Sequence, residues 1–339
     1  MANRLQSIIS RGGLRSVRGH LALLAFSILF LAPFAWLVST SLKHESSIFP
    51  KPGEPPEWIP RTIQRDAEGR RLVNYRGSIA VDLGVTDDGA QRLLVNGAKV
   101  RLAEGEAFEV RKRIGLHWQN YVQAFQTIDV VQSTRNTLFV CFMCVIGTVL
   151  SCALVAYGFS RIEWPGRNLL FIVVISTMMI PYQVTLIPLF VLYKQIGWSG
   201  SFKPLTMPAF FGAPFFIFLL RQFFMGVPRD LSAAARIDGC TEFGIFLRIL
   251  VPLSKPALAT TALFMFLGTW SDFLSPLVFL QDESQFTLAV ALQQFQNQHE
   301  SLWGPLMAMS TVITLPVIML FFLTQKTFIQ GIALTGLKG

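Results

Sequence analysis

The sequence predicts an all-α integral membrane protein with six transmembrane helices and a small β-rich insert between the first two. Hydrophobic residues make up 52% and charged residues 14% of its 339 positions, whereas a soluble domain carries about 25% charged residues. Apolar stretches of about 20 residues, each long enough to cross about 30 Å of hydrocarbon, recur along the chain. The predicted spans are Leu21–Leu42, Thr137–Phe159, Leu169–Leu192, Leu205–Met225, Ala257–Leu280 and Leu306–Phe328.

The first segment, residues 1–42, combines a basic start with the first span. Four arginines and no acid precede the apolar stretch, which favours a cytoplasmic N-terminus. A cleavable signal peptide is the competing interpretation. The apolar stretch is too long for one, and no A-x-A-like cleavage site follows Leu42. We therefore expect an uncleaved span.

Residues 43–135 form a polar insert between the first two spans. The insert opens with Pro50, Pro52 and Pro55 and then turns to short strand-like runs. The clearest hairpin signal is Leu93–Val100, where Asn-Gly separates two runs that contain apolar residues. We expect a partly β module on the extracytoplasmic side, and its role stays open at this point.

Composition and motifs exclude several functions. The net charge is +9, but the basic residues do not form a patch with interleaved aromatic residues. Nucleic acid binding is therefore excluded. Cys141 and Cys144 have CxxC spacing but lie in an apolar run without a second ligand pair, which indicates packing rather than a metal site. The chain shows no set of nucleophile, base and acid typical of an enzyme.

Residues 225–256 form a charged interruption between two apolar stretches, far longer than a simple turn. Pro228 and Asp230 indicate the start of a short helix rich in alanine. Gly239 then accepts a positive φ at a turn. Thr241 is expected to cap a second helix that ends before prolines 252 and 256. The sequence thus predicts two short helices joined by an elbow.

This segment resembles the EAA loop of binding-protein-dependent ABC transporter permeases. The matching positions are the alanine pair Ala234 and Ala235, then Gly239, Ile249 and Pro252. Two positions depart from the family pattern, because Ala233 stands where the family has Glu and Val251 where it has Leu. The resemblance implies a loop that docks on an ATPase subunit. The residues assigned to this coupling loop are Ala233, Ala234, Ala235, Arg236, Asp238, Gly239, Phe243, Ile249 and Pro252.

Other segments resemble the carbohydrate branch of this family, of the maltose type and its second permease subunit. They are Tyr157–Arg161, Met178–Pro188, Trp270–Leu277 and the C-terminal tail, of which residues 329–339 are expected in the cytoplasm. Asp272 is the acid embedded in an apolar run, and it either lines the translocation path or pairs inside the helix bundle. The candidate path residues are Pro181, Pro188, Trp270, Asp272, Phe273 and Pro276.

The resemblance implies a permease subunit of an ATP-driven importer for a sugar or oligosaccharide, working by alternating access in the bacterial inner membrane. It implies a core over residues 136–328 and cytoplasmic termini. The implied partners are a second permease subunit, two ATPase subunits, an extracytoplasmic solute-binding protein and membrane lipid. The sequence contains no G-x-x-x-x-G-K-[ST] run, so the chain is expected to bind no cofactor, with ATP and Mg²⁺ held by the partner ATPase.

Two alternatives from other classes remain. An ion-coupled secondary transporter needs paired intramembrane ionisable groups or an inverted repeat, and the sequence shows one embedded acid and no evident repeat. A membrane sensor that uses the insert leaves five further spans without a purpose.

Overall fold

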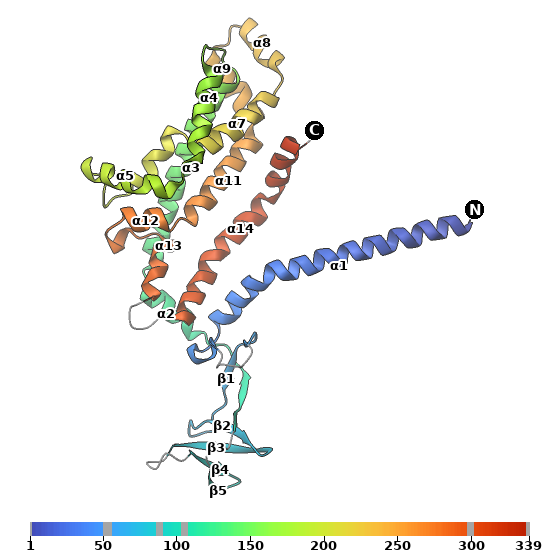
Figure 1. Cartoon of the computed structure of the whole chain (residues 1–339), viewed down its shortest axis with the longest axis vertical. Coiled ribbons are helices and arrows are strands. Elements are labelled where there is room, and N and C mark those ends of the chain that lie inside the picture. Colours follow the sequence, from blue (N-terminus) through green and yellow to red (C-terminus); the bar gives the residue numbers. More distant parts are fainter. Residues whose placement is uncertain (1, 50–55, 86–90, 103–107, 297–301, 337–339) are drawn as a thin grey trace. The chain divides into compact units, whose positions relative to one another are not determined.

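The computed structural model describes residues 2–49, 56–85, 91–102, 108–296 and 302–336 (Figure 1). The chain folds into two compact units, residues 1–127 with 295–312 and residues 128–294 with 313–339. The expected proline-rich opening at Pro50, Pro52 and Pro55, and the last three residues of the expected tail, lie outside the described residues. The remainder of that tail belongs to a helix.

The first unit contains two helices that meet through a buried amide. These are α1 (Ala2–Ser41) and α2 (Gln119–Thr127). The Asn120 side chain donates to the carbonyl oxygens of Ser41 at 2.9 Å and Lys43 at 2.8 Å. A single amide thus satisfies the carbonyl groups where α1 ends, which the helix itself leaves unpaired.

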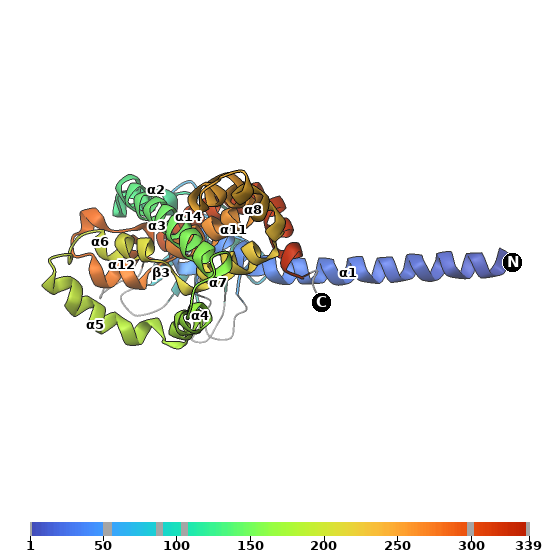
Figure 2. The same cartoon turned by 90° about the horizontal axis from the view of Figure 1, so that it is seen from above.

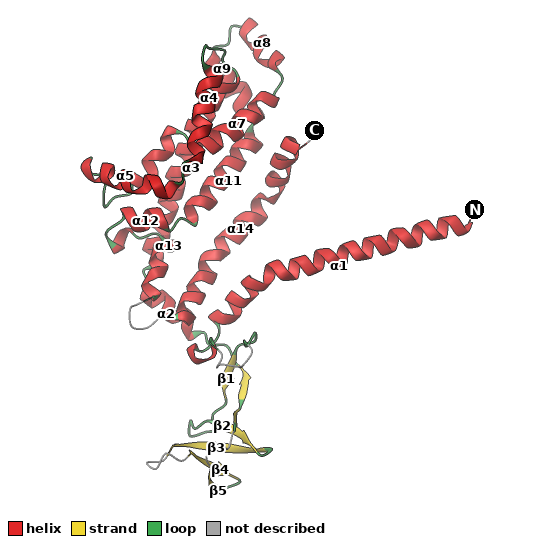
Figure 3. Ribbon diagram, in the orientation of Figure 1, coloured by secondary structure: helices red, strands yellow, loops and turns green. Residues whose placement is uncertain are grey.

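Between α1 and α2, the described residues form seven short strands, and Figure 3 shows strands in this part of the chain. They are β1 (Arg61–Ile63), β2 (Leu72–Tyr75), β3 (Ser78–Val85), β4 (Gln91–Val95), β5 (Ala98–Arg101), β6 (Glu109–Val110) and β7 (Lys112–Ile114). One antiparallel sheet has the order β5-β4-β3-β2-β6, and β1 pairs with β7. Asn96 and Gly97 both have positive φ, 48° and 85°, as a type I′ turn requires. The predicted hairpin is confirmed.

The sheet has its own small core. Val73, Tyr75, Ala80, Leu93 and Leu102 are buried together. In β2 the buried residues alternate with an exposed asparagine, the pattern of a strand with one face covered and one in water. The insert therefore contains a packed module rather than an extended linker.

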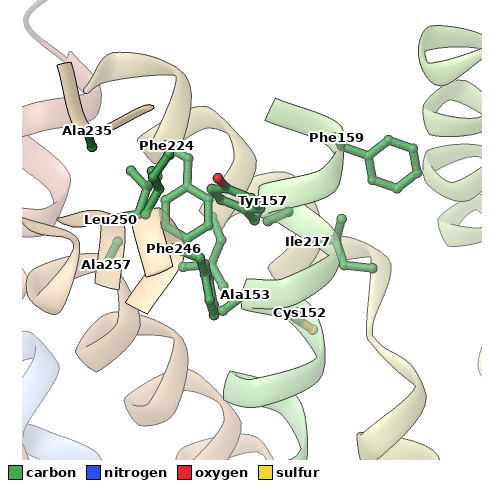
Figure 4. Close-up of a cluster of buried hydrophobic side chains, with 13 residues drawn as sticks. Cys152, Ala153, Tyr157, Phe159, Ile217, Phe224, Ala235, Phe246, Leu250 and Ala257 are labelled. Atoms are coloured by element: carbon green, nitrogen blue, oxygen red, sulfur yellow. The ribbon is translucent and has the colours of Figure 1, made fainter. Parts of the chain in front are cut away.

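The second unit is a helical bundle built around α3 (Val130–Ser160). This helix packs against α7 (Pro214–Gly226) and α11 (Lys255–Trp270). Its core includes Tyr157, Leu220, Phe224 and Leu250. Figure 4 shows this cluster, with Tyr157, Phe224 and Leu250 labelled. The other helices of this unit are α4 (Arg167–Ser176), α5 (Tyr182–Gln195), α6 (Lys203–Thr206), α8 (Arg229–Ile237), α9 (Glu242–Ile245), α10 (Val251–Leu253), α12 (Leu274–Phe279) and α13 (Leu288–Ala291).

Short 3₁₀ turns and one π-helical turn complete the chain. The 3₁₀ turns are η1 (Glu45–Ser47), η2 (Thr177–Met179), η3 (Met207–Phe211), η5 (Glu283–Gln285) and η6 (Leu292–Phe295), and the π-helical turn is η4 (Phe246–Leu250). The last helix, α14 (Trp303–Gly336), contributes residues to both units.

Four helical segments are long and apolar enough to cross a membrane, and six if each of two bent helix pairs counts as one span, among the described residues. The pair α4 with η2 and α5 bends by 95°, and Figure 2 shows α5 turned away from α4. The bend falls at Pro181, which has no N–H to continue the helical hydrogen bonds. The second pair, Glu242–Leu253 and Lys255–Trp270, bends by 78°.

Three details differ from the sequence-based expectation. The predicted span Ala257–Leu280 breaks after Trp270, where the Asp272 carboxylate accepts the backbone N–H of Ser275 at 3.2 Å and starts a separate helix. Asp230 is not a cap but lies in the first turn of α8, where its charge suits the helix dipole. Pro252 does not end the second helix of the elbow, because it occupies the start of α10, where a missing N–H costs little.

Candidate functional site

The segment Arg229–Leu253, called the elbow from here on, projects two short helices from one end of the helical bundle (Figure 1). In α8 the face that carries Ser232 and Ala235 is buried, and Ala235 joins the bundle core (Figure 4). Ala233 and Ala234 lie on the exposed face. The alanine pair is therefore divided, one residue packing inward and the other facing out.

The turn after α8 depends on Gly239. Its φ is +78°, in the left-handed region that favours glycine. The Gly239 N–H donates to Arg236 O at 3.1 Å and the Cys240 N–H donates to Ala235 O at 2.9 Å. These two bonds form a Schellman motif, which satisfies the last carbonyl groups of the helix. Asp238 is the C-cap residue that precedes it.

The second helix starts as predicted at Thr241, whose side chain accepts the backbone N–H of Gly244 at 3.2 Å. It runs through α9, the π-helical turn η4 and α10. Within it Phe243 is exposed, Ile249 is half-buried, and Phe246 and Leu250 are fully covered. The sequence thus predicted the cap and the turn correctly but not the π-helical turn.

Glu242 ties the elbow to the bundle. Its Oε1 accepts from Arg236 Nε at 2.7 Å, and its Oε2 accepts from the Tyr157 hydroxyl at 2.5 Å. The hydrogen bond to Glu242 also raises the pKa of Arg236, so the guanidinium stays charged at every physiological pH. One carboxylate therefore joins α8, α9 and α3. Arg236 was among the predicted coupling residues, whereas Tyr157 and Glu242 were not.

A second arginine secures the chain just before the elbow. The Arg161 guanidinium is buried and donates to the carbonyl oxygens of Phe224 at 2.5 Å and Val227 at 2.6 Å. These carbonyls belong to the last turn of α7 and the residue after it, and the Phe224 carbonyl also accepts the Val227 N–H at 3.2 Å. Arg161 also lines a cavity of about 380 Å³ with residues of α8. Burial of a charged side chain against two carbonyl oxygens fixes the direction in which the chain enters the elbow.

The elbow exposes apolar side chains that the sequence-based prediction largely missed. Ile237 is 88% exposed and Phe243 is 62% exposed. Leu231, Leu247 and Leu253 are also exposed. Large apolar side chains exposed on a segment with many charged residues are typical of a surface that binds another protein. Of this group only Phe243 was predicted as a coupling residue.

A cavity of about 210 Å³ lies within the helical bundle. Asp272 and Pro276, both candidate path residues, line it. Its other lining residues include Tyr182 and Ser275, whose hydroxyl oxygens are 3.0 Å apart. Further polar lining groups come from α3, α5 and α11, namely Thr137, Tyr193 and Thr269. The cavity therefore collects hydroxyl groups and one carboxylate inside an apolar bundle.

The remaining candidate path residues do not line this cavity. Trp270 is buried and stacks on Phe266, with ring centroids 5.5 Å apart. Pro181 precedes α5 and Pro188 lies inside it, while Phe273 is exposed beside the helix break. Of the six candidate path residues, Asp272 and Pro276 therefore line the cavity. The other four lie in or beside the helices α5, α11 and α12.

Several apolar helices of membrane-crossing length and an exposed elbow define a multi-pass membrane protein that works with another protein. The chain belongs to the family described as the binding-protein-dependent transport system inner membrane component, which matches residues 146–333. That match contains the bent helix pairs, the elbow and most residues that line the cavity, whereas Thr137, Val140 and Cys144 of the lining precede it. The predicted family and the prediction of a transport subunit in the inner membrane are thereby confirmed.

Curated relatives share the same region. The chain is 36% identical over 204 residues to the arabinooligosaccharides transport system permease protein AraQ of Bacillus subtilis, covering 60% of this chain and 72% of that protein. It is 33% identical over 226 residues to the trehalose/maltose transport system permease protein MalG of Thermococcus litoralis, covering 65% and 81%. These matches favour neither the secondary transporter nor the sensor.

Solved structures show the same fold. A chain of a bacterial ABC transporter involved in the import of the acidic polysaccharide alginate superposes with a TM-score of 0.66 at 18% identity, covering 92% of this chain and 96% of that one. The coverage includes more of the chain than the sequence matches do, so the similarity of fold extends beyond the family region.

Proposed function

We propose that this chain is a permease subunit of an ATP-driven importer that takes up a sugar or oligosaccharide. The observation that carries the proposal is the elbow, in which Gly239, the divided alanine pair and an exposed apolar surface occur together on a transport-family chain. The similarity to the arabinooligosaccharides and trehalose/maltose permeases supports a carbohydrate as the solute.

In the proposed topology each bent helix pair counts as one span, which makes six. Both termini and the elbow then face the cytoplasm, and the module that contains β1–β7 faces outward. The arginines before the first span and those around the elbow agree with this orientation, because basic residues are enriched in cytoplasmic segments. In this topology the cytoplasmic N-terminus and first span are residues 1–42, and the outer module is residues 43–135. The permease core is residues 136–328, and the cytoplasmic tail is residues 329–339.

The proposed partners are a second permease subunit, two ATPase subunits and an extracytoplasmic solute-binding protein, all within or beside membrane lipid. The chain has no phosphate-binding glycine loop of its own, so ATP and Mg²⁺ would be held by the ATPase subunits. The exposed apolar group of the elbow would insert into the ATPase, since buried aromatic and aliphatic anchors dominate the affinity of such interfaces.

Coupling would run from the elbow to the bundle through Glu242. When the ATPase subunits close around ATP, α8 would move with them. The Arg236–Glu242–Tyr157 contacts would transmit this movement to α3, the helix around which the bundle is packed. Alternating access then follows from a change in the packing of α3 against α7 and α11, a rigid-body motion of the kind that such bundles support.

Site-specific photo-crosslinking tests the docking proposal. A photoreactive benzoyl-phenylalanine is placed at the exposed position Ala234 in one variant and at Asn74, an exposed residue of β2 in the outer module, in the control. We expect a crosslink to a nucleotide-binding subunit from position 234 and none from the control. A chain without any crosslink from position 234, in membranes where the importer is active, would contradict the docking proposal.

A further inference from the structure

The cavity of about 210 Å³ in the helical bundle has one charged side chain, Asp272, among the described residues that line it. The other polar lining groups are hydroxyls, from Thr137, Tyr182, Tyr193, Thr269, Ser275 and Thr287, and one is the thiol of Cys144. Lysine, arginine and histidine are absent from this described lining. The cavity is therefore polar but contains no group that would neutralise an anion.

We propose that this cavity is a solute-binding site that accepts sugars without negative charge and rejects acidic ones, with Asp272 as the residue that discriminates between them. The proposal rests on the proposed function as a sugar permease and names the solute class that the path takes. It assigns binding to this chain's own residues.

The hydroxyl of Thr287 in the cavity wall lacks a hydrogen-bond partner among the described residues. Thr287 is buried. Buried polar groups are normally paired, and an exception calls for an explanation such as a ligand. A sugar hydroxyl in the cavity would supply that partner. Thr137, which is equally buried, shows the contrast, since its hydroxyl donates to Ser133 O and accepts from the Leu288 N–H.

The cavity wall also combines ring faces with polar groups. Tyr193 and Phe279 both line the cavity, with ring centroids 5.3 Å apart. Tyr182 and Ser275 place two hydroxyls 3.0 Å apart on α5 and α12. Apolar walls with a few well-placed polar groups are typical of small-molecule sites. A sugar ring presents the matching surfaces, C–H faces and hydroxyl edges.

The charge of the Asp272 carboxylate also favours neutral sugars. Asp272 uses Oδ1 to accept the backbone N–H of Ser275, and a carboxylate has lone pairs for further donors. Hydroxyl donors to an ionised carboxylate form strong hydrogen bonds. A uronate carboxylate in the same cavity would instead be repelled, because like charges interact more strongly inside a protein than in water.

Thiol-directed sugar reagents of equal size test the proposal. Methanethiosulfonate derivatives of glucose and of glucuronate are reacted with the purified chain that carries Thr269→Cys. Modification is read at that position by peptide mass spectrometry, so the native cysteines remain. We expect the glucose reagent to react at least tenfold faster, a ratio that corresponds to about 1.4 kcal/mol.

Two controls assign the selectivity. At Gln281→Cys, an exposed position outside the cavity, the two reagents should react within twofold of each other. With Asp272→Asn added to Thr269→Cys, the ratio should fall below threefold, and asparagine keeps an oxygen for the Ser275 N–H. Equal rates in the single variant, a ratio unchanged by Asp272→Asn, or no reaction at position 269 would each overturn the proposal. The experiment needs no partner subunit, so its failure would leave the transport assignment intact.

Discussion

At the scale of single residues, Glu242 is the carboxylate on which the elbow depends. Two donors from different elements converge on it, Arg236 from α8 and Tyr157 from α3. Arg236 and Glu242 are 46% and 43% exposed, so their ion pair alone contributes at most about 1 kcal/mol. Tyr157 is buried, and its bond to a charged acceptor is worth more. We infer that the Tyr157 contact contributes most of the attachment.

Tyr157→Phe tests this ranking. The substitution removes one hydroxyl donor to an ionised carboxylate and should lower the free energy of unfolding in detergent by about 1.5–3 kcal/mol. Arg229→Ala is the control, because it breaks an ion pair with Glu163 whose side chains are 69% and 75% exposed, and should change stability by less than about 0.5 kcal/mol. Denaturation followed by tryptophan fluorescence measures both. An equal effect of the two variants would show that the hydroxyl does not hold the elbow.

His117 predicts how the first unit responds to pH. Burial, with a smaller effect from the neighbouring His44, lowers the pKa of His117 below its usual 6.5. The folded state therefore binds fewer protons than the unfolded state, so stability increases with pH in this range. We expect the unit to lose stability as the pH falls below about 6.5. In the variant His117→Gln, the stability should depend less on pH over this range. Thermal unfolding of the wild-type chain and the variant at pH 5.0 and 7.5 measures this dependence. The same change in stability between the two pH values in both chains would contradict the prediction.

At the scale of elements, sequence signals of short range predicted the structure well. The Asn96-Gly97 turn, the left-handed Gly239 and the Thr241 cap depend on residues within four positions of each other, and the structure has all three. Contacts between distant segments could not be read in this way. Tyr157 and Glu242 are 85 positions apart, and the cavity around Asp272 draws on several helices. The motif Trp270–Leu277 contains Asp272, Ser275 and Pro276, but no local signal predicted that they would line a cavity with Thr137 and Tyr193.

Gly239 shows what the elbow requires of the backbone. No neighbouring atom lies within 4 Å of where a Cβ would be, so a substitution acts through φ rather than through a clash. Gly239→Val should cost about 1–2 kcal/mol of local strain and reduce solute-stimulated ATP hydrolysis by the assembled importer at least fivefold, with normal amounts of chain in the membrane. Gly239→Asn should retain most of the activity, because asparagine tolerates positive φ. Equal activity of the valine and wild-type chains would be the contrary result.

Helix α3 offers a matched pair of glycines. A Cβ at Gly147 would lie 2.8 Å from the Phe210 ring and 3.1 Å from the Ala209 backbone, whereas a Cβ at Gly158 would meet nothing within 4 Å. Gly147→Ala should destabilise the bundle by about 1–3 kcal/mol through overpacking. Gly158→Ala should stabilise it by up to about 1 kcal/mol through helix propensity. Unfolding in detergent measures the stability of both variants. A change of the same sign in the free energy of unfolding of both would argue against the close packing of α3 on η3.

At the scale of the whole molecule, the chain combines three features. The bundle contains a polar cavity, the elbow exposes apolar side chains beside an anchored glycine turn, and a β module is inserted before the second span. Family membership explains the first two. The module lies outside residues 146–333, so the family match does not account for it.

The central claim is that the elbow couples this permease to a separate ATPase. Purification of the chain from its native membrane in mild detergent, followed by mass spectrometry of the intact complex, tests it most directly. We expect one copy of this chain with a second permease and two ATPase subunits, and loss of the ATPase subunits when exposed Ile237 and Phe243 are both replaced by Asp. A stable chain that purifies alone from membranes with active uptake, or a complex unaffected by those replacements, would contradict it.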